Sequence, residues 1–300
     1  MYDTIIIGGG PSGMSAALNL LRANKKVLIL EKESFGGQIA SSPRVENFPT
    51  IPSISGLDLT NRLLEQIMNL GVEFDVDEVV GITKEDNIFK IKTLYNSYEA
   101  RSVIIATGLI HRKLNLESEE RLEGKGISYC AVCDGAFYKG EDVVVIGDAN
   151  TALQYSILLS NYCNKVYLYT LFDKFFADQI LVDRMNNIEN IIVRHNVNTK
   201  EFIGQNELEE VHFVDTKTNE DVYLKVKAAF IAIGQLPNNK IFSNLVDLDE
   251  KGFIIVNSKQ ESKTEGLYAV GDCTKKDYYQ LITGMSEAAI AALNITKYLS

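Results

Sequence analysis

The sequence has no apolar stretch that could cross a membrane and no leader-like beginning. A spanning helix needs about 18–20 consecutive apolar residues, and the chain has no run of that length. Its first residues pass directly into the apolar run 4–7, with no basic region followed by a long hydrophobic one. We therefore expect a cytoplasmic protein that has no membrane partner.

Basic residues are also few. The chain has 30 Lys and Arg against 40 Asp and Glu, which gives a formal net charge of −10 at pH 7. Nucleic acids and anionic lipid surfaces repel a chain with this balance. We therefore expect no nucleic acid partner.

Cysteine and histidine are too sparse for a disulfide scaffold or a zinc centre. The chain has four Cys and three His. A structural zinc site commonly uses two pairs of ligands, but Cys163 and Cys273 stand alone and His111, His195 and His212 have no ligand spacing. We expect no bound metal, and we interpret Cys163 and Cys273 as packing residues.

What the chain does have is an alternation of strand-like and helix-like segments, which favours an α/β fold. An apolar strand over 4–7 leads into Gly8-Gly9-Gly10-Pro11-Ser12-Gly13, and a helix is predicted over 14–23. The next strand, 27–30, ends at Glu31. This G-x-G-x-x-G turn can hold a pyrophosphate at the helix N-terminus, while the acid accepts hydrogen bonds from a ribose.

A second unit of the same kind is predicted in the middle of the chain, with strand, turn, helix and strand at residues 142–146, 147–152, 151–161 and 165–169. Each unit has a later apolar strand that closes on glycine, Gly108 for the first and Gly234 for the second. A further strand-like segment, 266–272, and an Ala-rich helix follow. We therefore expect a discontinuous first domain, 1–112 and 241–300, with a second domain, 113–240, inserted in it.

Between the two turns stands the pair Cys130 and Cys133. Thiols at this spacing can close a small disulfide ring, and a thiolate is the form that attacks another disulfide. The adjacent carboxyl group of Asp134 can deliver or remove the proton that the exchange requires. The pair therefore predicts disulfide redox chemistry.

These motifs together resemble the low-molecular-weight thioredoxin reductase family over essentially the whole chain. The matching segments are 8–13, 36–38, 45–49, 105–108, 130–135, 271–272 and 279–280. The resemblance implies two Rossmann-like three-layer domains of the FAD/NAD(P)-binding type, the second inserted in the first, and a homodimer. It also implies that Cys133 faces the flavin, Cys130 attacks thioredoxin and Asp134 is the acid/base.

The resemblance further implies a bound FAD. Glu31 would bind the adenosine ribose, Asp272 the ribityl chain and Gln280 the flavin ring. The residues expected at the cofactor are Gly8, Gly10, Pro11, Ser12, Gly13, Glu31, Lys32, Gly37, Gln38, Asn47, Ala106, Thr107, Gly108, Gly271, Asp272, Gln280 and Leu281.

The second turn departs from the family pattern. Ala149 stands where a pyridine nucleotide would need glycine, and Asp148 adds a carboxylate to the pyrophosphate loop. Two like charges about 4 Å apart at an effective dielectric near 20 cost about 4 kcal/mol. At the end of the next strand the family presents arginines to the 2′-phosphate of NADPH, whereas this chain has Tyr-Thr-Leu-Phe at 169–172.

We therefore expect reduced ferredoxin as the electron donor, as in the ferredoxin-dependent flavin thioredoxin reductases, the subgroup that this sequence resembles most. A flavin accepts electrons singly and passes a pair to a disulfide. The drop from ferredoxin to thioredoxin, about 130 mV, releases roughly 6 kcal/mol for two electrons. Lys275 and Lys276 are the candidate docking residues.

Two alternatives stay open. The first is an NADPH-dependent thioredoxin reductase with a divergent nucleotide site, which uses Lys165, Lys174 or Arg184 in other ways. The second is a non-catalytic flavin redox sensor, although a sensor has no need of an acid/base at Asp134.

Overall fold

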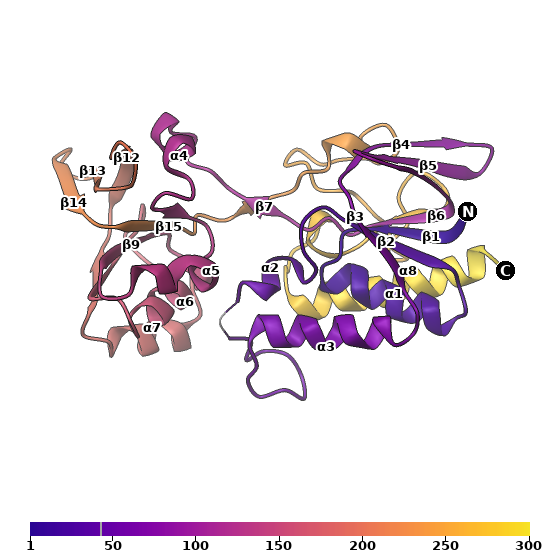
Figure 1. Ribbon diagram of the computed structural model, residues 1–300, viewed down its shortest axis with the longest axis horizontal. Coiled ribbons are helices and arrows are strands. Elements are labelled where there is room, and N and C mark those ends of the chain that lie inside the picture. The colour runs from indigo at the N-terminus through magenta and orange to yellow at the C-terminus, as the bar shows by residue number, and fades with distance from the viewer. Residues whose placement is uncertain (43) are drawn as a thin grey trace. The chain divides into compact units, whose positions relative to one another are not determined.

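The computed structural model describes residues 1–42 and 44–300, which divide into two compact units (Figure 1). The first unit comprises Met1–Ile110 and Leu236–Ser300, and the second comprises His111–Gln235. The expected boundaries, after residues 112 and 240, fall a few residues later than these. The difference arises because the two connections form short strands of their own, β7 (Ile110–His111) and β16 (Gln235–Leu236), which pair with each other.

A seven-stranded sheet forms the middle of the first unit, in the order β3-β2-β1-β6-β5-β4, with β17 also paired to β6. The sheet branches at β6, whose first residues pair with β5 in antiparallel fashion and whose last residues pair with β17 in parallel. The last four residues of both β1 and β6 are buried, which is typical of parallel strands covered on both faces. The strands are β1 (Tyr2–Ile7), β2 (Val27–Glu31), β3 (Glu73–Val76), β4 (Val79–Glu85), β5 (Ile88–Thr93), β6 (Ser97–Ile105) and β17 (Leu267–Ala269).

Three helices, α1 (Pro11–Arg22), α3 (Gly56–Met68) and α8 (Leu281–Tyr298), cover one face of this sheet (Figure 1). The core between α1 and α8 contains Ala16 and Ala17 from one helix and Ala288 from the other, small residues that allow the two backbones to approach. A short helix, α2 (Gly37–Ala40), precedes α3. The opposite face of the sheet packs against residues from the loops before β17, including Phe242 and Ile254.

The second unit is built on a five-stranded parallel sheet in the order β11-β10-β9-β15-β8. Helices α6 and α7 pack on one face, and a three-stranded antiparallel sheet, β12-β13-β14, packs on the other, which gives three layers. The elements are α4 (Glu117–Leu122), β8 (Ile127–Ser128), α5 (Ala131–Asp134), β9 (Asp142–Ile146), α6 (Asn150–Leu159), β10 (Lys165–Tyr169), α7 (Gln179–Asn186), β11 (Ile191–Arg194), β12 (Val197–Ile203), β13 (Glu210–Asp215), β14 (Asp221–Lys225) and β15 (Ala228–Ile231).

The expected fold class is confirmed: both units are α/β and Rossmann-like, and the second is inserted in the first. Over residues 1–42 and 44–300, no helix is long and apolar enough to cross a membrane.

The small β12-β13-β14 sheet offers a test of how the second unit is stabilised. Phe213 on β13 is fully buried and its ring lies 4.8 Å from that of Tyr169, whereas Tyr223 on β14 is 57% exposed. Phe213→Ala should lower the free energy of unfolding by about 3–5 kcal/mol, because it leaves a cavity. Tyr223→Ala, the matched control, should cost less than about 1 kcal/mol. Urea denaturation measures both, and equal losses would contradict this assignment of the core.

Candidate active site

The first glycine turn lies where β1 and β6 end and α1 begins. Gly8 has a φ of +111°, and a Cβ there would lie 2.3 Å from the carbonyl oxygen of Ala106. A Cβ on Gly13 would lie 2.0 Å from the carbonyl oxygen of Gly8. Side chains at these positions would separate the strands from the helix, so glycine is required for the turn to close.

Glu31 ends β2 and is held against this turn. Its carboxylate accepts the Gly9 N–H at 2.7 Å and the Glu33 N–H at 3.0 Å. Lys32, by contrast, forms an ion pair with Glu33 at 2.8 Å, which raises the pKa of Lys32. Its side chain therefore contacts Glu33 and not the glycine turn.

The turn also gathers predicted residues from elsewhere in the first unit. A Cβ on Gly37 would lie 3.3 Å from the Cα of Gly10 and 3.8 Å from the Cδ of Pro11. A Cβ on Gly271 would lie 2.5 Å from the Oγ of Ser12. Segments near residues 10, 37 and 271 therefore converge on the N-terminus of α1.

Three polar contacts extend from this centre. The Nδ2 of Asn47 donates to the Oε1 of Gln280 at 2.9 Å, just before α8 begins at Leu281. The Nε2 of Gln38 donates to the Leu109 carbonyl oxygen at 3.3 Å. Thr107, which with Ala106 and Gly108 follows β6, donates to the Oδ1 of Asn239 at 3.3 Å.

Asn239 belongs to this site and is absent from the sequence-based expectations. It is 2% exposed, and its Nδ2 donates to the carbonyl oxygens of Gly252 and Cys273 at 2.9 Å each. Asn239 therefore ties the strand end at Thr107 to the turn before Cys273. These partners are distant in sequence, and no local pattern marks them.

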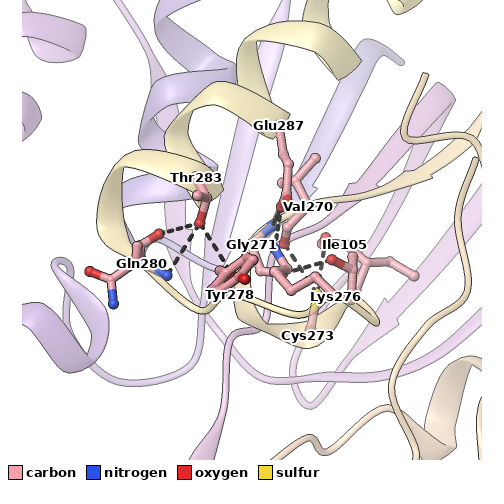
Figure 2. Close-up of polar contacts among 10 residues, drawn as sticks. Ile105, Val270, Gly271, Cys273, Lys276, Tyr278, Gln280, Thr283 and Glu287 are labelled. Carbon is pink, nitrogen blue, oxygen red and sulfur yellow. Dashed lines mark hydrogen bonds and ion pairs between the residues drawn. The ribbon is translucent and has the colours of Figure 1, made fainter. Parts of the chain in front are cut away.

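A buried ion pair fixes the turn that contains Gly271 and Asp272 (Figure 2). Glu287 on α8 accepts the Gly271 N–H at 2.9 Å and pairs with the ammonium group of Lys276. The Lys276 side chain is only 11% exposed, so it is unavailable for docking, and that part of the expectation for Lys275 and Lys276 is wrong. Burial raises the pKa of Asp272; the positive charge of Lys276 opposes this shift, and the negative charge of Glu287 adds to it.

In the second unit, Cys130 and Cys133 form a disulfide. Cys130 is the residue before α5, and its Sγ accepts the Cys133 N–H at 3.1 Å. Cys133 is the more exposed of the two. The Asp134 carboxylate at the end of α5 accepts a hydrogen bond from Ser128 at 2.6 Å. A Cβ on Gly135 would lie 2.4 Å from the Oη of Tyr162 and 2.7 Å from the Cδ2 of Leu159, so glycine allows this segment to pack on the end of α6.

Tyr129 anchors the residue before the disulfide. Its hydroxyl donates to Glu119 at 2.7 Å, and its carbonyl oxygen accepts the Tyr155 hydroxyl at 3.1 Å. Glu119 is fully buried and also accepts the Leu114 N–H at 3.1 Å. Burial and the Glu119 carboxylate raise the pKa of Tyr129, so the phenol remains a donor. Tyr129, the residue before Cys130, is therefore held both by its side-chain hydroxyl and by its backbone carbonyl oxygen.

The second turn keeps the geometry of the first. Gly147 has a φ of +153°, and a Cβ there would lie 2.2 Å from the Ala232 carbonyl oxygen. Ala149 precedes α6, and burial raises the pKa of Asp148. The Phe176 N–H donates to the Asp148 carbonyl oxygen at 2.7 Å, which brings the loop after β10 onto the turn.

The loop that follows β10 presents apolar side chains. Leu171, Phe172 and Phe176 are 47%, 51% and 54% exposed. The Lys174 ammonium group lies 5.2 Å from the Phe176 ring centre. Lys165 begins β10 and is about 13 Å along the strand from Tyr169, where this loop starts. This loop has no arginine to hold a 2′-phosphate.

Two glycine turns of dinucleotide type with a dithiol pair in an inserted unit define a disulfide oxidoreductase. The profile of the pyridine nucleotide-disulphide oxidoreductase family matches residues 2–291, and the chain belongs to this family. Over 300 residues it is 37% identical to a thioredoxin reductase of Bacillus subtilis, which covers 100% of this chain and 95% of that protein.

The structure is similar to two solved reductases. A thioredoxin reductase of Lactococcus lactis matches with a TM-score of 0.95 and 34% identity, over 100% of this chain and 99% of that one. A ferredoxin–flavin thioredoxin reductase of Clostridium acetobutylicum matches with a TM-score of 0.55 and 27% identity, over 99% and 97%. The resemblance to thioredoxin reductases is confirmed, while the ferredoxin-dependent subgroup is the more distant neighbour.

Members of this family bind FAD, and the first unit fits it. A Cβ on Gly10 would meet only the Cα of Gly37, at 3.9 Å, so the backbone there is open to a ligand. The first N–H groups of α1 lack intrahelical partners and can receive a pyrophosphate. Glu31 is oriented by backbone donors at the adjacent strand end, where a ribose would lie.

Gly10→Ala should weaken FAD binding by about tenfold or more, because the added methyl group would occupy the space that the pyrophosphate needs. The fold should be unaffected, because the protein has room for this methyl group. Flavin content after dialysis and titration of the apoprotein with FAD measure the loss. Gly81→Ala is the control, since a Cβ there meets nothing within 4 Å. Unchanged FAD affinity in Gly10→Ala would place the pyrophosphate elsewhere.

The two remaining cysteines are buried and unpaired by disulfides. Burial raises the pKa of both Cys163 and Cys273 to about 11. Across the part of the chain that the structure describes, no three His, Cys, Asp or Glu side chains gather as a metal site.

A thiol titration at about pH 8 should therefore separate the cysteines, because only about one in a thousand of the buried thiols would be ionised. The native oxidised protein should show no reactive thiol, the native reduced protein two, and the reduced unfolded protein four. A third fast-reacting thiol in the native reduced protein would contradict the burial of Cys163 or Cys273.

Proposed function

We propose that this chain is a thioredoxin reductase, which transfers an electron pair from bound FAD through Cys130 and Cys133 to the disulfide of thioredoxin. The observation that carries the proposal is the Cys130–Cys133 disulfide beside Asp134, in a chain that aligns along its full length with proteins named thioredoxin reductase. A homodimer and a cytoplasmic location remain predictions.

The proposed exchange uses the cysteine roles that the family resemblance implies. In the reduced enzyme, the Cys130 thiolate attacks one sulfur of thioredoxin, and the other thioredoxin sulfur leaves and takes up a proton. Cys133 then attacks the Sγ of Cys130, which releases reduced thioredoxin and re-forms the disulfide. Asp134 serves as the acid/base for these proton transfers. Bound FAD, once reduced by the external electron donor, would supply the electron pair that opens the disulfide again.

The roles of the two cysteines can be separated by trapping. In Cys133→Ser, Cys130 can still attack, but no second thiol remains to break the mixed disulfide that it forms. A single-cysteine thioredoxin activated as a mixed aryl disulfide should therefore become covalently attached to Cys130. Cys130→Ser should give no adduct, and both variants should lose turnover. Mass spectrometry detects the adduct. An adduct formed by Cys130→Ser would reverse the assignment, which deserves a direct test because Cys133 is the more exposed residue.

A pyridine nucleotide is the donor that the comparisons support best, in place of the expected ferredoxin. The chain is 37% identical to the thioredoxin reductase of Bacillus subtilis and 34% identical to that of Lactococcus lactis, against 27% for the ferredoxin–flavin reductase. One observation favours ferredoxin as the second candidate: the loop after β10 offers Leu171 and Phe172, and not arginine, where the family holds the 2′-phosphate.

Because this loop has no arginine to bind the 2′-phosphate in bidentate fashion, NADPH and NADH should reduce the flavin with efficiencies within about tenfold of each other. Anaerobic titration that follows flavin bleaching measures each donor. The double variant Leu171→Arg/Phe172→Arg should shift the preference toward NADPH. Bleaching by reduced ferredoxin, with none by either nucleotide, would reject the nucleotide donor and support ferredoxin.

A further inference from the structure

Ser128 lies between the redox disulfide and the proposed acid/base. It is the last residue of β8 and is 6% exposed. Its Oγ lies 2.6 Å from the Oδ2 of Asp134, and it accepts the Cys130 N–H at 3.0 Å. The carbonyl oxygen of Cys130 is 3.3 Å from the same hydroxyl. One side chain therefore contacts both the backbone of Cys130 and the carboxyl group of Asp134.

The hydroxyl can serve Asp134 in both of its protonation states. An ionised carboxylate only accepts, so the single Ser128 proton is donated to it. A protonated carboxyl group can donate to the Ser128 oxygen instead, and the serine proton can then turn to the Cys130 carbonyl oxygen. Asp134 can thus take up and release a proton without leaving a partly buried polar group unpaired.

The surrounding contacts keep this arrangement in place. Tyr129, between Ser128 and Cys130, is held by Glu119 through its hydroxyl and by Tyr155 through its carbonyl oxygen. A hydroxyl on a fixed segment can orient a carboxylate more closely than a mobile surface group could.

We propose that Ser128 is a positioning residue for proton transfer in the thiol–disulfide exchange: it orients Asp134 and couples it to the backbone of Cys130. The inference rests on the proposed function, in which Asp134 is the acid/base. It adds a residue to which neither the family pattern nor the sequence gave a role.

The test is a single turnover that does not depend on the electron donor. The enzyme is reduced anaerobically with dithionite, freed of excess reductant and mixed with oxidised thioredoxin. The rate of thioredoxin reduction is then recorded from about pH 3 to about pH 10, which brackets ordinary carboxyl and thiol ionisation.

Ser128→Ala should lower this rate by about tenfold. It should also move the lower midpoint of the pH profile upward by about half to one pH unit, because the ionised carboxylate loses a donor. Ser128→Thr should restore both rate and midpoint, whereas Ser128→Val, which has the shape of threonine without the hydroxyl, should behave like Ser128→Ala. The Thr and Val pair keeps the test valid if Ser128→Ala does not fold.

Tyr155→Phe is the matched control, because it removes a hydrogen bond from the same segment without touching Asp134. It should leave the midpoint unchanged, even where thermal stability falls. In an Asp134→Asn background, Ser128→Ala should cause no further loss of rate.

Two outcomes would overturn the inference in distinguishable ways. If Asp134→Asn slows the exchange but Ser128→Ala leaves the midpoint in place, or slows both backgrounds equally, Ser128 is only structural and the proposed function stands. If Asp134→Asn reduces thioredoxin like the unmodified enzyme, the acid/base assignment itself fails, and the role of Ser128 fails with it.

Discussion

Both units depend on backbone atoms that approach each other more closely than any side chain would allow. At the first turn a Cβ on Gly13 would lie 2.0 Å from a carbonyl oxygen, and at the second a Cβ on Gly147 would lie 2.2 Å from one. The first contact seats α1 on the end of β1, and the second brings the ends of the neighbouring strands β9 and β15 together where α6 begins. In the first unit the same closeness leaves the N-terminus of α1 open to a pyrophosphate and brings Glu31, Gly37 and Gly271 around it.

The second turn shows that this geometry can persist while its chemistry changes. Gly147 keeps the turn closed, yet Asp148 and Ala149 stand in the loop, and the strand end carries Leu171 and Phe172. The fold requires the glycine that lets the two strand ends approach each other, whereas the ligand determines the residues that face it.

Much of the architecture could be predicted from local pattern. The strands expected at 142–146 and 165–169 coincide with β9 and β10, because buried parallel strands are short apolar runs. Helix α1 begins at Pro11, earlier than expected, since proline at the first helical position needs no N–H partner. The β12-β13-β14 sheet was not predicted, because its strands are half exposed and mix charged with apolar residues.

The parts of the site that sequence missed depend on contacts between distant segments. Asn239 and Lys276 reach the site through partners that no spacing rule connects. Glu287 offered a signal, since it is the one acidic or basic residue in the otherwise uncharged stretch 281–296. A lone charge in an apolar helix is commonly paired, and this one holds the Gly271 turn.

The nested arrangement also sets the order in which a ribosome can deliver a complete molecule. The inserted unit, His111–Gln235, is continuous and has all its strands once residue 235 has emerged. The first unit is incomplete until β17 and α8 have been synthesised, because β17 completes one branch of its sheet and α8 covers the core around Met14 and Ile104. At about 5–20 residues per second, the last 65 residues take roughly 3–13 s to synthesise. During that interval the part of α1 that packs against α8 is uncovered, although α3 is already present, and the nascent chain is at its most exposed to chaperones and to aggregation.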